Sequence, residues 1–261
     1  MRILLTGAAG AVGRLLTPLL QQHYELRLVD LQPLGGALQG DLANPDFALH
    51  AVSGMDAVVH LAGLVASQVT FEDTLNPNYR AVLALLEACR RENVRRFVFA
   101  SSHHIQGLHL SRNTSSESEA QAPDGFYALS KVFGEAASAM YAHRFQIRTL
   151  AIRIGNADAQ VVDGRRERLW ISARDLAQLI GIGLRSEDLH YEIVYGVSNC
   201  ENGLFPNDNA KRLGYRPQDW AQECRAADFR PLSSLGPEDG PEFVGGRFAA
   251  DPLPDPFARL R

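Results

Sequence analysis

Lysine is scarce in this chain: Lys131 and Lys211 are the only two lysines among 261 residues, so the 26 basic side chains are almost all arginines. Cysteine is scarce as well, and Cys89, Cys200 and Cys224 are widely spaced with no Cys-x-x-Cys pair. This spacing argues against a disulfide framework or a zinc site and is typical of reduced thiols. We therefore expect a cytoplasmic protein that binds no metal.

The chain also lacks any apolar run long enough to cross a bilayer, and a strand-like run follows Met1 and Arg2 directly. We expect neither a membrane span nor a cleavable leader. The net charge is −4 with both signs interspersed, and the arginines form no stripe that would follow phosphates. Nucleic acid and membrane surfaces are therefore not expected as partners.

Short apolar runs alternate with stretches of helical spacing as far as residue 154, and 46% of the chain is hydrophobic. The alternation predicts an α/β fold with a Rossmann-like, doubly wound parallel sheet covered by helices on both faces. The expected strands are Arg2–Thr6, Glu25–Asp30, Ala57–His60, Arg96–Ala100 and Ile147–Ile154. The expected helices are Val12–Gln22, Leu75–Arg91 and Tyr127–Arg144.

The pattern loosens after Gly155. We expect a charged loop over Asp163–Arg168, a helix over Ala173–Leu184, a strand over Tyr191–Tyr195, and an irregular wrap or interface arm from residue 231 onward. The polar stretch 111–125 is either a solvated loop or a rim of the site. This organisation predicts a cofactor-binding domain over residues 1–155, followed by a small substrate-binding lobe and tail over residues 156–261.

A glycine-rich turn with Gly-x-x-Gly-x-x-Gly spacing follows the first strand and opens a helix. Gly7 permits the tight turn, Gly10 lets the backbone approach a pyrophosphate, and Gly13 allows close packing of helix and sheet. The helix start adds amide donors and a positive dipole end. The turn therefore predicts a dinucleotide site that includes Gly7, Ala9, Gly10, Ala11, Val12 and Gly13.

Asp30 ends the second strand about 20 residues beyond the turn, where a carboxylate can bind the adenosine ribose. It would repel a 2′-phosphate, so NAD is favoured over NADP. Asp41, which precedes Leu42, is either near the adenine amine or a simple turn residue. Asn78 is either a structural bridge or a surface amide. The remaining expected cofactor contacts are Leu42, Leu61, Ala62, Gly63, Asn78, Ala100, Tyr127, Lys131 and Ile154.

Tyr127 and Lys131 are four residues apart and share one face of a helix. An ordinary tyrosine has a pKa of roughly 10, and a neighbouring ammonium stabilises the phenolate, so Lys131 is expected to make Tyr127 a better base. Ser102 follows the strand Arg96–Ala100 at the edge of the sheet where ligands bind, and would hydrogen-bond the reacting oxygen. The alternatives are an exposed helix tyrosine and a turn hydroxyl.

These motifs together make the chain resemble the extended short-chain dehydrogenases, the superfamily of sugar epimerases and dehydratases, and most of all the uronate dehydrogenases. That family oxidises hexuronic acids at C1 with NAD. The matching stretches are Leu5-Thr6-Gly7-Ala8-Ala9-Gly10, Phe99-Ala100-Ser101-Ser102-x-His104, Pro123-Asp124-Gly125-Phe126-Tyr127-x-x-Ser130-Lys131, Arg153-Ile154-Gly155 and Gly245-Gly246-x-Phe248.

The resemblance also implies a sugar site. Arg165 would hold the substrate carboxylate, since a planar guanidinium grips a carboxylate in two places; a solvated loop is the alternative for 164–168. Where the family has serine, asparagine and serine, this chain has Val65, His103 and Asn156, which leaves the identity of the sugar open. The expected sugar contacts are Val65, Ser102, His103, His104, Tyr127, Asn156 and Arg165.

The resemblance therefore implies NAD-dependent oxidation of an acidic aldohexose at C1 to its lactone, with Tyr127 as base. A homo-oligomer is expected as the default for a soluble enzyme with an extended tail. A 6-sulfonated glucose or a neutral aldose remain alternative substrates. A nucleotide-sugar epimerase or dehydratase is a rival function, although the part after residue 155 is short for a nucleotide-binding lobe. A non-catalytic NAD sensor is a second rival, and it would not need the Tyr127–Lys131 pair.

Overall fold

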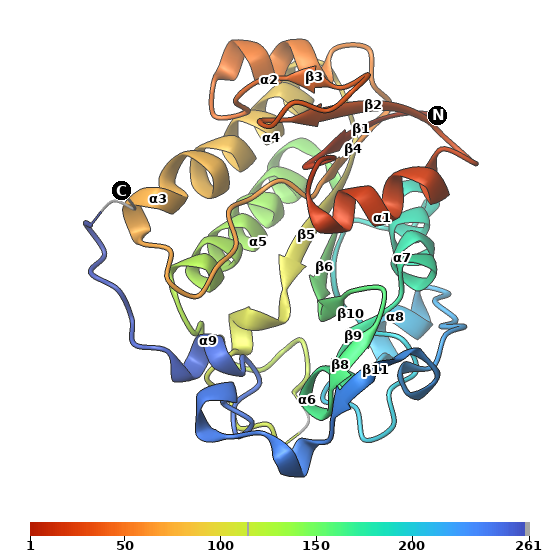
Figure 1. The fold of residues 1–261 in the computed structure, drawn as a ribbon. Coiled ribbons are helices and arrows are strands. Elements are labelled where there is room, and N and C mark those ends of the chain that lie inside the picture. Colours follow the sequence, from red (N-terminus) through yellow and green to blue (C-terminus); the bar gives the residue numbers. More distant parts are fainter. Residues whose placement is uncertain (114, 259–261) are drawn as a thin grey trace.

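The computed structural model of the chain describes residues 1–113 and 115–258. Its centre is a seven-stranded sheet of parallel strands in the order β10-β6-β5-β4-β1-β2-β3 (Figure 1). The strands are β1 (Arg2–Thr6), β2 (Glu25–Asp30), β3 (Leu38–Gln39), β4 (Ala57–His60), β5 (Arg96–Ser102), β6 (Arg148–Ile154) and β10 (Tyr191–Gly196). The predicted doubly wound fold is confirmed.

Helices cover both faces of the sheet (Figure 1). On one face lie α1 (Ala11–Leu20) and α7 (Ala173–Arg185), and on the other lie α2 (Pro45–Val52), α4 (Ala81–Arg91) and α5 (Phe126–Phe145). The central strand β1 serves both layers, because Ile3 and Leu5 pack with Leu16 of α1 while Leu4 packs with Leu85 of α4. Side chains alternate along a strand, so a strand buried on both faces is apolar throughout.

The strand order reverses between β1 and β4. From β1 the chain moves outward to β2 and β3, whereas β4, β5, β6 and β10 extend the sheet in the opposite direction. Crossover loops at the carboxyl ends of β1 and β4 therefore diverge and leave a crevice, which is where ligands bind in open parallel sheets. The glycine-rich turn stands at this point.

Small elements gather beyond the carboxyl end of the sheet, in the lower part of Figure 1. They are β7 (Asn156–Ala157) paired with β9 (Trp170–Ile171), β8 (Val161–Asp163) paired with β11 (Arg225–Arg230), α6 (Gly164–Glu167) and α8 (Asp208–Arg212). The prediction of a loop over Asp163–Arg168 was wrong. Asp163 ends β8 and caps the start of the short helix α6. Its carboxylate accepts a hydrogen bond 2.7 Å long from the amide of Arg166 in that helix.

The sheet does not stop at residue 155, since β10 is its edge strand and α7 packs beside α1. Several other elements had no counterpart in the sequence prediction. They include α2, β11 and α3 (Phe71–Thr74). The helix predicted over Leu75–Arg91 is present, but its first part, Leu75–Arg80, is π-helical and joins α3 to α4. In the described residues no helix is both long and apolar enough to cross a membrane.

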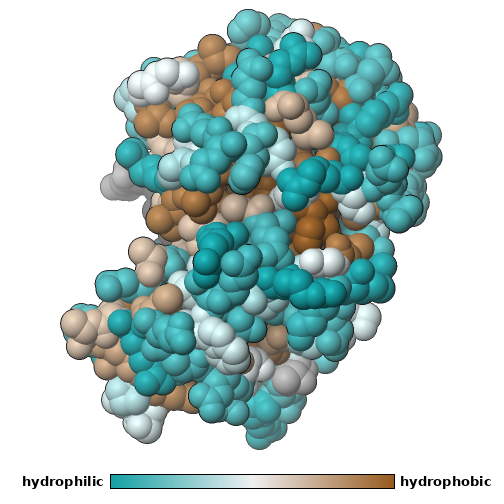
Figure 2. Space-filling view, turned by 90° about the vertical axis from the view of Figure 1, so that its right-hand side faces the viewer, coloured by the Kyte–Doolittle hydropathy of each residue, from teal (hydrophilic) through white to brown (hydrophobic). Residues whose placement is uncertain are grey.

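The C-terminal segment, residues 231–258, wraps around the molecule as an irregular strap with two 3₁₀ turns, Leu232–Ser234 and Pro237–Asp239, and one short α-helix, α9 (Arg247–Ala250). It begins in the lower lobe and ends beside α3 (Figure 1). The amide of Val244 donates to the carbonyl of His109 over 2.9 Å, and the amide of Glu72 donates to the carbonyl of Pro256 over 3.2 Å. The face shown in Figure 2 is mostly hydrophilic. Apolar residues gather at mid-height, between the upper part, which contains the sheet, and the lower part, which contains the small elements.

Candidate active site

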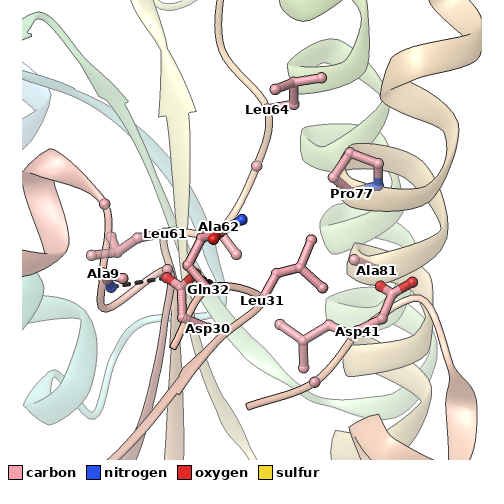
Figure 3. A pocket seen from close by; sticks show the side chains of 15 residues that line it. Ala9, Asp30, Leu31, Gln32, Asp41, Leu61, Ala62, Leu64, Pro77 and Ala81 are labelled. Carbon is pink, nitrogen blue, oxygen red and sulfur yellow. Dashed lines mark hydrogen bonds between the residues drawn. The ribbon is translucent and has the colours of Figure 1, made fainter. Parts of the chain in front are cut away.

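A pocket of about 450 Å³ opens at the point where the strand order reverses (Figure 3). Nine of the residues predicted to bind a cofactor line it: Gly7, Ala9, Gly10, Asp30, Asp41, Leu42, Leu61, Ala62 and Gly63. Six lining residues were missed by the sequence prediction: Leu31, Gln32, Gly40, Leu64, Pro77 and Ala81. Leu31 and Gln32 follow Asp30 directly, so the position of that carboxylate was a signal that could have found them.

The carboxylate of Asp30 is fixed by two backbone amides. Ala9 of the glycine-rich turn donates to Oδ2 over 2.8 Å, and Gln32 donates to Oδ1 over 2.9 Å (Figure 3). The first bond joins the end of β2 to the turn after β1. The carboxylate is thereby held at the rim of the pocket. Its separation from the turn along the sequence, about 20 residues, is the one expected for an acid that binds the ribose.

The glycine-rich turn fits a pyrophosphate. Gly7 has a φ of +71°, and a Cβ atom there would lie 2.7 Å from the amide nitrogen of Ala62. Gly13 does not line the pocket; a Cβ there would lie 2.2 Å from the carbonyl oxygen of Gly7, so its role is close packing of α1 on the strand. Helix α1, which starts with Ala11 and Val12, has no side-chain cap, which leaves its first amides for an anion.

Tyr127 and Lys131 lie on α5 beside this pocket. Lys131 is buried, and its ammonium donates to the carbonyl of Ala100 over 2.8 Å. The ammonium also lies 5.7 Å from the centre of the Tyr127 ring. A Cβ atom at Gly63, which lines the pocket, would lie 3.5 Å from the same nitrogen. The structure therefore brings the Tyr127–Lys131 pair to the edge of the proposed cofactor pocket.

Asn78 is a structural bridge. Its side chain accepts from the amide of Leu64 over 2.7 Å and donates to the carbonyl of Leu64 over 3.0 Å and to the hydroxyl of Ser130 over 2.8 Å. Ser130 in turn donates to the carbonyl of Tyr127 over 2.6 Å. These bonds tie a wall of the pocket to the first turn of α5, so that the positions of Leu64 and Tyr127 are coupled.

Burial dominates the electrostatics of the pair. It raises the pKa of Tyr127 to about 12, while the hydrogen bond with the Ser102 side chain acts in the opposite direction. Burial also lowers the pKa of Lys131 to about 8. We expected from the sequence that Lys131 would lower the pKa of Tyr127. In the protein itself the removal of the phenol from water has the larger effect, because a phenolate is poorly stabilised there.

The two serines at the end of β5 differ in their surroundings. Ser101 donates to Glu135 over 2.6 Å, and Glu135 forms a buried ion pair with Arg153 at 2.9 Å, so Ser101 belongs to a structural network. The hydroxyl of Ser102 accepts from the amide of His104 over 3.3 Å and bonds to Tyr127. Ser102 is therefore the serine that faces the tyrosine.

A second cluster of side chains lies beside Tyr127. His104 Nδ1 lies 2.6 Å from Oδ2 of Asp124, and the His104 ring lies 4.2 Å from the ring of Phe248 and 5.8 Å from that of Tyr127. Asp124 is clamped between two glycines, since a Cβ at Gly107 or Gly245 would lie 1.9 Å from its Oδ2. Asp124 and Phe248 had no predicted role, although both lie in the motifs that carry the resemblance.

Arg165, which lies in α6, is the arginine of the stretch 164–168 that enters this cluster. It is buried, it donates to the carbonyl of Val244 over 2.9 Å, and its charge contributes to lowering the pKa of both His103 and His104. Burial lowers the pKa of Arg165 itself to about 10. The other two candidates are engaged elsewhere: Arg166 pairs with Asp163, and Arg168 donates to the carbonyl of Asn202 over 2.8 Å.

The remaining predicted residues lie at the edges of the site. His103 Nδ1 is 3.0 Å from the carbonyl oxygen of Ile154 at the end of β6, and Asn156 follows two residues later. Val65 lies in the loop after β4, is 58% exposed and is not part of the pocket lining. Across the ranges 1–113 and 115–258, no three His, Cys, Asp or Glu side chains are grouped to hold a metal ion.

Comparison with known proteins agrees with this architecture. The NAD dependent epimerase/dehydratase family matches residues 3–160. A uronate dehydrogenase from Pseudomonas putida is 36% identical over 256 residues, which cover 95% of each chain. The structure of a mutant uronate dehydrogenase from Agrobacterium tumefaciens complexed with NAD superposes with a TM-score of 0.88 at 33% identity, covering 96% of this chain and 97% of that one.

A glucuronic acid dehydrogenase from Chromohalobacter salexigens gives the same TM-score of 0.88 at 32% identity, again covering 96% and 97% of the two chains. The likeness thus extends from the glycine-rich turn through the small lobe to the C-terminal segment. The chain belongs to the NAD dependent epimerase/dehydratase family and, within it, to the family of the uronate dehydrogenases.

Proposed function

We propose that this protein oxidises an acidic aldohexose, a sugar of the uronate type, at C1 to its lactone and transfers the hydride to NAD. The observation that carries the proposal is the grouping of these residues. Gly63 of the dinucleotide pocket lies close to the Lys131 ammonium, and Lys131 and Ser102 lie beside Tyr127. The His104 ring next to Tyr127 is in turn close enough to the buried guanidinium of Arg165 for that charge to lower its pKa. Proteins named uronate dehydrogenases are similar to this chain over nearly its full length.

The pocket residues would hold NAD by its adenosine and pyrophosphate. The glycine-rich turn and the start of α1 would hold the phosphates, Asp30 would bind the ribose hydroxyls, and apolar lining side chains such as Leu31 and Pro77 would contact the adenine. The carboxylate of Asp30 disfavours a 2′-phosphate, since two like charges would meet there. NAD, when bound, supplies the hydride acceptor.

Tyr127 takes the proton from the C1 hydroxyl. Its pKa of about 12 in the protein means that the phenolate needs partners, and Ser102 is one of them. The ammonium of Lys131 and the positive charge of an oxidised nicotinamide would lower the pKa further. Ser102 also holds the sugar oxygen against Tyr127, so that the proton and the hydride leave from a fixed geometry.

Arg165 fixes the acidic end of the sugar. A buried guanidinium with a lowered pKa gains from any anion that replaces the water it has lost, and its planar fork suits a carboxylate. His103, His104, Asn156 and Val65 would surround the sugar hydroxyls. We propose that residues 1–155 bind the cofactor, while the part after residue 155 that lies outside α7 and β10 adds Asn156, Arg165 and the C-terminal segment to the sugar site. The protein would act in the cytoplasm as a homo-oligomer.

A panel of sugars tests the proposal. Purified protein with NAD is supplied with glucuronate, galacturonate, 6-sulfonated glucose or glucose, and the absorbance of NADH is followed. We expect stoichiometric NADH formation with at least one uronate and much slower formation with glucose. A preference for the sulfonated sugar would support an anionic substrate of another kind. Absence of NADH with every sugar would overturn the proposal.

The rival function predicts a different product. A nucleotide-sugar epimerase returns the hydride to the substrate, so NADH does not accumulate while the sugar is converted. Incubation with UDP-glucose and NAD, followed by separation of the sugars, would reveal inversion at C4. We expect no conversion of UDP-glucose. The nucleotide would need a larger lobe than the part of the chain after residue 155 provides, and the buried side chains of Arg165 and His104 occupy the site next to Tyr127.

A further inference from the structure

The ring of His103 is held in one protonation state. Its Nδ1 lies 3.0 Å from the carbonyl oxygen of Ile154, and a carbonyl oxygen only accepts hydrogen bonds, so Nδ1 carries the proton. Burial, with the charges of His104 and Arg165, lowers the pKa of His103 well below its ordinary value. The ring is therefore neutral, and its other nitrogen, Nε2, has a lone pair and no proton.

Nε2 of His103 is buried, and it has no hydrogen-bond partner among the described residues. His103 as a residue is only 5% exposed, and the surroundings of its ring include the His104 ring at 4.1 Å and the Phe205 ring at 6.2 Å. Buried polar atoms in folded proteins are almost always paired, so an unpaired acceptor next to an active site indicates a missing donor.

A second unpaired atom lies nearby on the chain. Nδ2 of Asn156, a donor, is also buried without a partner in the described part of the protein. His103 is bonded to Ile154, and Asn156 follows Ile154 by two residues, so both side chains are anchored at the carboxyl end of β6. This edge of a parallel sheet is the edge that binds ligands. His103 also follows Ser102, which faces the reacting oxygen.

We propose that His103 is a specificity-determining residue that accepts a hydrogen bond from one ring hydroxyl of the sugar, while Asn156 donates to an oxygen of the same sugar. This inference rests on the proposed function and refines its substrate class. The sugar must carry a hydroxyl that can donate at the position facing His103. A group that only accepts, such as fluorine or a methyl ether, is rejected there, because two acceptors would face each other.

Fluorinated sugars provide the test, because fluorine removes the donor and nearly preserves size. The probes are glucuronate, or galacturonate if it is the better substrate, and its 2-, 3- and 4-deoxyfluoro analogues with NAD. In the wild-type protein, we expect fluorine at one position to lower kcat/KM roughly 10- to 100-fold more than at the other two, which is the usual effect of an unpaired buried polar group. In His103→Phe that extra loss disappears.

His103→Asn is the matched variant, since its amide oxygen still accepts while its amide nitrogen also donates. It should restore part of the kcat/KM that His103→Phe loses on the parent sugar, and it should tolerate fluorine better than the wild-type protein does. NADH binding, followed by fluorescence, is expected to be equal in all three proteins. If His103→Phe does not bind NADH, the comparison of wild type with His103→Asn decides.

Labelled histidine gives a reading that does not depend on turnover. Long-range ¹⁵N–¹H spectra of the wild-type protein should contain one neutral ring with a protonated Nδ1 and a bare Nε2 that disappears in His103→Asn. A protonated Nε2 would overturn the inference, as would equal fluorine effects in wild type and variants. Absence of NADH with every sugar would remove the proposed function as well, so the two failures are distinguishable.

Discussion

The ring of Phe248 lies 4.2 Å from the ring of His104 and 6.3 Å from that of Tyr127, although Phe248 belongs to the C-terminal segment. The tail therefore forms a wall of the site. We expect Phe248→Ala to raise KM for the sugar and to lower kcat, because the wall that excludes water and orients the sugar is lost. NADH binding should change little. Phe257→Ala, at a 73% exposed position of the same segment, is the control. Equal kinetics in both variants would contradict this role.

Tyr127→Phe is expected to lower kcat roughly 100- to 10,000-fold, the usual range for loss of a general base. NADH binding should persist, because the ring and the bond from Ser130 to the main-chain carbonyl of Tyr127 remain. Tyr141→Phe removes a hydroxyl from the same helix, where it contacts Glu87 at 3.3 Å, and should leave turnover unchanged. Single-turnover measurements with a uronate would separate chemistry from product release. A fully active Tyr127→Phe protein would exclude the tyrosine as base.

Arg165→Met should weaken the preference for charged over neutral sugars. Removing one member of a buried charge pair costs about 2–5 kcal/mol, so we expect the ratio of kcat/KM for glucuronate to that for glucose to fall at least roughly 30-fold. Arg166→Met is the control, because Arg166 is 39% exposed and pairs with Asp163. The measurement is the ratio, which a general loss of stability leaves unchanged. An unaltered ratio would show that the acid group binds elsewhere.

Asp30→Ser should shift the cofactor preference towards NADP. The variant loses a carboxylate that two amides hold at the pocket rim, so the repulsion of a 2′-phosphate disappears. We expect the ratio of kcat/KM for NADP to that for NAD to rise at least roughly tenfold, because like charges in contact cost several kcal/mol. Asp46→Ser, on the exposed start of α2, serves as the comparison. Parallel losses with both cofactors would contradict a role in discrimination.

Asp124→Asn should change how stability depends on pH. Burial raises the pKa of Asp124 from 3.8 to about 7, so the folded protein binds more protons than the unfolded chain between these values. The contribution of Asp124 to the free energy of unfolding therefore decreases as the pH rises through that window, by up to about 1.4 kcal/mol per pH unit. Relative to wild type, the variant should gain roughly 1–3 kcal/mol between pH 4 and 7.5.

His104 acts in the opposite sense. Burial, together with Arg165, lowers its pKa from 6.5 to about 3, so its contribution to stability increases with pH between these values in both proteins. Comparison of urea unfolding at pH 4, 5.5 and 7.5 gives the combined contribution of Asp124 and of its contact with His104, because the two side chains lie 2.6 Å apart. A difference in unfolding free energy that is independent of pH would contradict a raised pKa at Asp124.

Local chemistry made the first half of the fold predictable. The strand Arg2–Thr6, the glycine-rich turn and the carboxylate of Asp30 are separated by short distances in sequence, and each requires a particular residue type at its position. The pairing of Tyr127 with Lys131 follows from helical spacing alone. These are the parts of the site for which residue type and spacing were sufficient.

Contacts between distant segments were not predictable in this way. The bond between His104 and Asp124 depends on a polar loop of irregular shape, and the contact of Phe248 depends on a tail without periodicity. The π-helical stretch ahead of Ala81 shifts Pro77 and Ala81 into the pocket, and a regular 3.6-residue pattern does not reveal such an insertion. The raised pKa of Tyr127 likewise arises from tertiary burial, which residue spacing does not report.

The clamp on Asp124 restricts how this enzyme can be re-engineered for other sugars. Any side chain larger than hydrogen at Gly107 or Gly245 would collide with the carboxylate, so mutant libraries gain nothing by sampling those two sites. Diversity is better spent on Val65, which is open to solvent, and on Asn156, whose amide nitrogen has no hydrogen-bond partner among the described residues. Directed evolution at such positions would alter sugar selection while the scaffold beneath it stays intact.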